Sequence, residues 1–91
     1  MSQSSKLSLA RPGDCGVIAR VGEPGGGDEH SLELERRLLE LGFVEGARVE
    51  LLHEGLFRSD PIAMKVDDMR VALRRHEAAS LMVQFEPARS A

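Results

Sequence analysis

A leucine-rich segment that runs into two closely spaced glycines constrains the fold of this chain most. Residues 37–46 have the sequence RLLELGFVEG, and Gly42 stands where a leucine-rich helix must end. Glycine adopts positive φ without the steric cost of a Cβ, so it commonly ends helices and forms tight turns. Phe43 follows directly and can fold back onto the last helical turn, and Gly46 precedes a strand-like run. We therefore predict a helix, a sharp reversal and a strand, with positive φ at both glycines.

The main helix should cover residues 30–41, with Ser31 as its candidate N-cap, and residues 75–80 should form one short helical turn. At about 100° per residue, one stripe of the main helix is apolar. It contains Leu34, Leu38 and Leu41.

Apolar and polar residues alternate in about five further segments, which is the pattern of half-buried strands. These segments are residues 15–21, 47–53, 62–66, 69–73 and 81–85. In the first of them we expect Val17, Ala19 and Val21 to share one face. Asp67-Asp68 separates the third and fourth, which indicates a β-hairpin, whereas residues 54–61 read as a loop.

This order of elements predicts a mainly β fold, a small barrel of about five strands with a helical insertion after the first strand. The 91 residues suffice for one domain, which we place at residues 6–86, with disordered polar tails at 1–5 and 87–91. Both periodicities converge on one predicted core: Leu38, Leu41, Phe43, Val49, Leu51, Ile62, Met64, Val71, Leu73, Leu81 and Val83.

Composition argues against several classes of protein. The formal net charge is −3, whereas a nucleic-acid binder needs a basic surface to neutralise phosphates. No apolar run approaches the roughly 18 residues that a membrane helix needs, and no signal peptide is evident, so we expect no membrane insertion. The single cysteine, Cys15, cannot form an internal disulfide, which favours a cytoplasmic location.

Catalytic motifs are also missing from the sequence. Cys15 has no neighbouring base, and Gly25-Gly26-Gly27 lacks the Lys-Ser/Thr that follows a phosphate-binding loop. The chain has no Trp and no Tyr, so it cannot build the usual aromatic groove for proline-rich peptides. We therefore expect a protein that is not an enzyme and that requires no cofactor.

A metal site finds only sparse support. His30 and Glu33 stand three residues apart on the predicted helix, where both can reach one ion, and His53 is a further candidate ligand. A dedicated zinc site generally takes four ligands. We therefore expect at most a weakly bound, adventitious divalent ion such as zinc or ferrous iron on these three residues.

Protein docking is the better-supported function. Leu32 and Leu39 lie outside the core stripe of the helix, and Leu56, Phe57 and Arg58 lie in the predicted loop. Apolar residues outside the core pattern are typical of interaction surfaces. The alternative, that the loop folds back and covers these side chains, stays open at this point.

Three motifs in order carry a resemblance to a known family. Residues 37–46, Asp60-Pro61-Ile62 and residues 72–78 (ALRRHEA) stand at a spacing that resembles the FeoA family, over about residues 7–83. The resemblance implies an SH3-like barrel with a helical insertion. It also implies an accessory or regulatory role in bacterial ferrous iron uptake, in which the chain docks on the cytoplasmic, GTP-binding part of the ferrous iron permease. The segment before Asp60-Pro61 departs from the family, whose loop commonly reads Pro-Leu-Gly-Asp-Pro.

The runner-up interpretation is a free-standing SH3-like module related to the C-terminal domain of DtxR-type metal-dependent repressors. That module shares the fold, but it works beside a DNA-reading domain with basic charge. The acidic composition of this chain does not favour this second interpretation.

Overall fold

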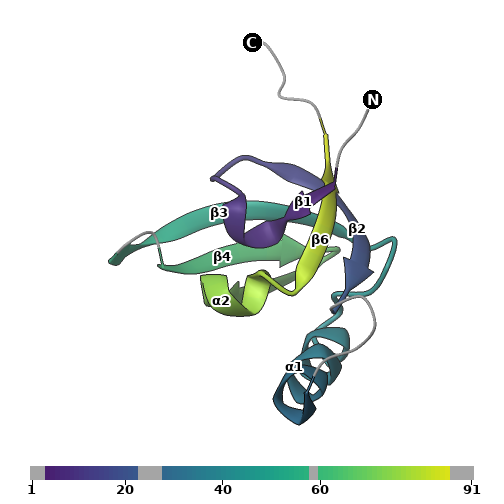
Figure 1. The fold of residues 1–91 in the computed structure, drawn as a ribbon. Coiled ribbons are helices and arrows are strands. Elements are labelled where there is room, and N and C mark those ends of the chain that lie inside the picture. Colours follow the sequence, from purple (N-terminus) through teal and green to yellow (C-terminus); the bar gives the residue numbers. More distant parts are fainter. Residues whose placement is uncertain (1–3, 23–27, 58–59, 87–91) are drawn as a thin grey trace.

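The computed structural model describes residues 4–22, 28–57 and 60–86, with only the backbone of Leu56 and Phe57. Strands dominate the described chain, and two α-helices and one short 3-10 helix interrupt them (Figure 1). In order, the elements are β1 (Ser4–Lys6), η1 (Leu7–Leu9), β2 (Cys15–Val21), α1 (Glu29–Glu40), β3 (Arg48–Phe57), β4 (Asp60–Val66), β5 (Met69–Leu73), α2 (Arg75–Ala78) and β6 (Leu81–Phe85).

The described strands form one curved antiparallel sheet in the order β1-β6-β2-β3-β4-β5, with β1 and β5 at its edges. The mainly β prediction with a helical insertion is confirmed, but the sheet has six strands instead of about five. The additional strand is β1, which contains Ser4 and Ser5 of the expected N-terminal tail and pairs with β6. A three-residue polar strand has too few residues to show an alternating pattern. Residues 1–3 and 87–91 of the expected tails lie outside the described residues.

Strand β2 does not present the expected face. Ile18 is buried, whereas Val17 is half-buried and Ala19 is exposed. The pairing of β2 with β6 shifts register between Ile18 and Arg20. Such a bulge inserts one extra residue and reverses the alternation of side chains beyond it. As a result, Ile18 and Val21 contact the core from one strand, although their spacing in the sequence does not fit a regular strand.

The prediction that residues 54–61 form a loop is wrong for most of this segment. Strand β3 continues to Phe57, and β4 begins at Asp60. The two strands pair over this extension, with Glu54 opposite Ile62 and Phe57 opposite Asp60. Gly55 permits the close approach, since a Cβ added there would collide with the backbone carbonyl oxygen of Asp60.

Helix α1 begins at Glu29, and Asp28 rather than Ser31 caps it. The carboxylate Oδ1 of Asp28 accepts a hydrogen bond from the backbone N–H of Ser31 at 2.9 Å. This hydrogen bond holds the pKa of Asp28 below its ordinary value. Either residue type can cap a helix, so only the backbone conformation at position 28 decided between them.

The other end of α1 closes as the glycines predicted. The backbone N–H of Phe43 donates to the carbonyl of Leu38 at 3.0 Å, and that of Gly42 to the carbonyl of Leu39 at 3.1 Å. This pair of bonds is a Schellman motif, which needs a left-handed residue after the helix. Gly42 has φ 103° and Gly46 has φ 87°, so the predicted positive φ values are confirmed. The turn buries Phe43 beside Leu38.

One apolar cluster fills the space inside the sheet, and most of the predicted core belongs to it. Leu41 and Val71 are exceptions, because they are only partly buried against its edge. Helix α1 packs on one end of the sheet, beside β2, so its last turn remains at the margin of the core (Figure 1). The prediction missed these buried residues: Leu7, Ala10, Ile18, Ala47, Val66 and Ala78.

We predict that Leu38→Ala lowers the free energy of unfolding by about 2–5 kcal/mol, because it removes a fully buried side chain beside Phe43. Leu32→Ala is the matched control on the same helix. Leu32 is 52% exposed, so its replacement should change stability by no more than about 0.5 kcal/mol. Chemical denaturation measures both, and equal midpoints for the two variants would show that α1 does not contribute to the core.

Candidate functional site

Arg75 joins four separate segments at the rim of the barrel. Its backbone N–H donates to the Asp60 carboxylate at 2.8 Å. Its guanidinium donates to the carbonyls of Ser8 at 2.7 Å and Ala10 at 3.0 Å, and forms an ion pair with Glu54 at 2.8 Å. Two of the three motifs, at Asp60 and at Arg75, therefore meet in one structural network.

We predict that Arg75→Lys destabilises the fold by about 1–3 kcal/mol, because an ammonium group cannot replace the fork of guanidinium donors, so partly buried acceptors lose their partner. Arg70→Lys on β5, where the side chain is exposed, is the control and should be nearly neutral. Thermal melts of the two variants would contradict this role of Arg75 if they coincided.

Cys15 lies half-buried at the start of β2 and bonds to a charged pair. Its Sγ donates to Glu86 Oε2 at 3.3 Å, and Arg48, which forms an ion pair with Glu86, reaches the same sulfur. The bond to Glu86 raises the pKa of the Cys15 thiol. A protonated thiol is a weak nucleophile, so this setting suits a structural cysteine.

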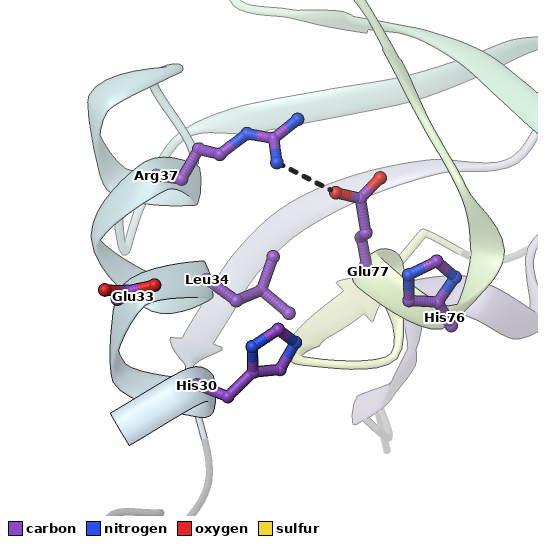
Figure 2. Close-up of a pocket in the computed structure, with 6 residues that line it drawn as sticks. All are labelled: His30, Glu33, Leu34, Arg37, His76 and Glu77. Atoms are coloured by element: carbon purple, nitrogen blue, oxygen red, sulfur yellow. Dashed lines mark ion pairs between the residues drawn. The ribbon is translucent and has the colours of Figure 1, made fainter. Parts of the chain in front are cut away.

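A cleft of about 380 Å³ separates α1 from α2. Its lining consists of His30, Glu33, Leu34, Arg37, His76 and Glu77. Figure 2 shows Leu34 and Arg37 reaching from α1 toward α2, where Arg37 forms an ion pair with Glu77 at 3.5 Å. The Arg37 side chain is 67% exposed, so this pair should contribute about 1 kcal/mol or less.

The three candidate metal ligands do not come together in this cleft. His30 and Glu33 line it, although Figure 2 shows Glu33 on the side of α1 away from α2. His53 is exposed on β3 and is not among the lining residues; the second histidine of the cleft is His76. Sequence spacing could not identify His76, because only tertiary packing brings α2 beside α1. Within residues 4–22, 28–57 and 60–86, no three His, Cys, Asp or Glu side chains gather as a metal site.

The candidate docking residues of α1 are exposed as expected. Leu32 is 52% and Leu39 is 41% exposed, and their spacing of seven positions, about two helical turns, places both on one helical face. Val44, which the sequence reasoning missed, is also exposed, directly beyond the helix. The side chains of Leu56 and Phe57, and all of Arg58, lie outside the described residues.

Comparison with known proteins decides the family. Residues 5–85 match the family model of the FeoA domain. The chain belongs to the FeoA family. It is 34% identical over 80 residues to the Fe(2+) transport protein A/Fe(2+) transporter FeoB fusion protein of Porphyromonas gingivalis (strain ATCC BAA-308 / W83). That alignment covers 88% of this chain but only 8% of the relative, so the chain spans a small part of that protein.

Solved structures confirm the SH3-like fold of this FeoA-family chain. The crystal structure of Stenotrophomonas maltophilia FeoA complexed with zinc, described as a procaryotic SH3 domain protein, has a TM-score of 0.70 and 31% identity and covers 88% of this chain and 93% of its own. A manganese-dependent transcriptional repressor matches with a TM-score of 0.74 at 21% identity, over 92% of this chain and 42% of its own. That likeness shows a shared fold.

Neither α1 nor α2, the α-helices in the described part of the chain, has the length and apolar character that a membrane span requires.

We predict that the purified chain binds zinc only weakly, because the described donors do not gather into the four-ligand shell of a stable zinc site. Titration calorimetry with zinc, and with ferrous iron under anaerobic conditions, measures this. His53→Ala is the control for nonspecific histidine binding. A sub-micromolar, one-to-one isotherm that both His30→Ala and His76→Ala abolish would contradict the prediction.

Proposed function

We propose that this FeoA-family chain is a cytoplasmic accessory protein of ferrous iron transport that docks on the cytoplasmic part of a FeoB permease. The observation that carries the proposal is the Porphyromonas gingivalis relative, whose name joins transport protein A and transporter FeoB in one fusion protein. A covalent link keeps two modules at an effective concentration of the order of millimolar. The fusion therefore suggests that the two modules act in contact with each other. Where the two modules are separate chains, the same contact requires an interface with enough affinity of its own.

The exposed face of α1 supports docking in this chain. The helix stands at one end of the sheet, clear of the strands on its outer side (Figure 1). Leu32 and Leu39 supply apolar area there, and Arg36 lies between them in the sequence and is exposed. An apolar centre with an arginine beside it fits the composition of protein interfaces. Leu56, Phe57 and Arg58 remain proposed docking residues, but β3 ends at the other end of the sheet from α1 (Figure 1), so they would make a separate contact.

The proposed role is regulatory and needs neither catalysis nor a bound metal. The Arg75 network and the hydrogen-bonded Cys15 contribute to the fold. The zinc in the name of the Stenotrophomonas maltophilia structure belongs to that protein. For this chain we propose at most weak divalent-ion binding, with docking independent of it.

The alternative is a module related to the C-terminal domain of DtxR-type repressors. The manganese-dependent repressor shares the fold at 21% identity, which supports a structural relation alone. Binding to the permease discriminates the two proposals, because a repressor module has no reason to recognise a transporter.

We predict that Leu32→Glu and Leu39→Glu each weaken binding to the isolated cytoplasmic part of the FeoB permease from the same organism by roughly tenfold or more, since each places a charge in the apolar centre of the interface. Biolayer interferometry or calorimetry measures the affinity, and circular dichroism verifies folding.

The matched control is Leu9→Glu on η1. Leu9 is 72% exposed, and η1 packs against α2 and β6 rather than α1. This variant should bind like the unmodified chain. If both α1 variants fold and bind with unchanged affinity, the interface lies elsewhere on the molecule.

A further inference from the structure

The exposed face of α1 carries a strongly asymmetric set of charges. At about 100° per residue, Leu32 and Leu39 lie within roughly 20° of each other around the helix axis. Three glutamates follow on one side, between about 60° and 100° from Leu32. This acidic ridge consists of Glu29, Glu33 and Glu40, all of them exposed. Arg36, which is also exposed, lies between the leucines and the glutamates at about 40°, so the leucine stripe has one arginine beside it and an acidic ridge beyond.

The carboxylates of the acidic ridge are available to a partner. Within the described part of the chain, the ion pairs shorter than 4.0 Å involve Glu54, Glu77 and Glu86, and none involves the ridge. Arg36 lies between the stripe and the ridge, whereas Arg37, at about 140° and beyond the ridge, forms an ion pair with Glu77 on α2. Three carboxylates and the guanidinium of Arg36 therefore leave a local charge of −2. A partner that covers the leucine stripe therefore comes close to this negative charge.

Electrostatics discriminates among the surfaces that could cover the stripe. A second copy of this chain, packed antiparallel through α1, would bring two acidic ridges together, and like charges at an interface oppose association. An anionic bilayer would be repelled for the same reason. A segment with apolar side chains flanked by Lys or Arg satisfies both the leucines and the ridge.

We propose that α1 binds a basic amphipathic segment, whose apolar side chains pack on Leu32 and Leu39 while its Lys or Arg side chains pair with Glu29, Glu33 and Glu40. The proposal rests on the proposed docking to the permease and adds the chemistry of the segment that is recognised. A polytopic membrane protein offers such segments, because its cytoplasmic stretches next to the membrane spans are enriched in Lys and Arg. Opposite charges of this kind accelerate association and determine which partner is accepted.

The first test measures binding to the cytoplasmic part of the permease at ionic strengths of about 0.05 and 0.5 M, between which screening of exposed charges increases strongly. The unmodified chain should bind more weakly at high salt. The double variant Glu33→Lys/Glu40→Lys should lose roughly tenfold or more at low salt and most of the salt dependence. Glu50→Lys, which makes the same type of charge change at an exposed position of β3, should retain both.

A second probe separates this inference from the proposed function. It is a synthetic amphipathic helix of Leu and Lys, compared with the same peptide carrying Glu in place of Lys. Binding of the Lys peptide alone, lost in Glu33→Lys/Glu40→Lys and in Leu39→Glu but kept in Glu50→Lys, supports the inference even if the permease does not bind.

Three results would overturn the inference. The first is permease binding by the double variant with unchanged affinity and salt dependence, which would leave the proposed docking intact. The second is equal binding of the Lys and Glu peptides, or of neither. The third is self-association of the chain in analytical ultracentrifugation that Leu39→Glu abolishes, since this would assign the stripe to a second copy.

Discussion

The guanidinium of Arg75 is the contact on which the rim of the barrel-like sheet depends. The guanidinium donates hydrogen bonds to the carbonyls of Ser8 and Ala10, in and just after η1, and forms an ion pair with Glu54 on β3. The backbone N–H of Arg75 donates to the carboxylate of Asp60 at the start of β4. Partly buried carbonyls need such donors, and one planar side chain supplies several at fixed angles. The residues that give the sequence its family motifs thus hold segments together that are far apart along the chain.

This network and the apolar cluster stabilise the strands, so α1 needs only one of its faces to pack on the sheet, and its other face is exposed. Its inner face contributes Leu34 and Leu38 to the core, and the Schellman turn at Gly42 anchors it through Phe43. Its outer face leaves leucines exposed beside an acidic ridge. A single exposed leucine is ordinary, but two lie here on one helical face, next to carboxylates that form no ion pair with the described residues, and such a patch is typical of an interaction surface. The inserted helix is therefore the part of the fold best placed to meet a partner.

Much of the fold could be predicted, and the failures within the sheet share one cause. The hairpin around Asp67, the final strand and the positive φ at Gly42 and Gly46 follow from nearby residues, and the structure has them all. The bulge in β2, the strand β1 and the extension of β3 do not, because partner strands impose them. At the candidate site the exposure of Leu32 and Leu39 was predicted correctly, whereas the second histidine of the cleft is His76 and not His53.

The sequence by itself determined the elements whose hydrogen bonds close within a few residues: the main helix, its glycine stop and the tight hairpin. It also determined which side of α1 is apolar and which is acidic, since helical periodicity depends on spacing alone. Tertiary structure decided the edges of the sheet, the register of β2 and the meeting of α1 with α2. Those features depend on contacts between residues that are distant in the chain. The free energy of such a contact depends on both segments together, so neither segment alone carries a periodic pattern that reveals it.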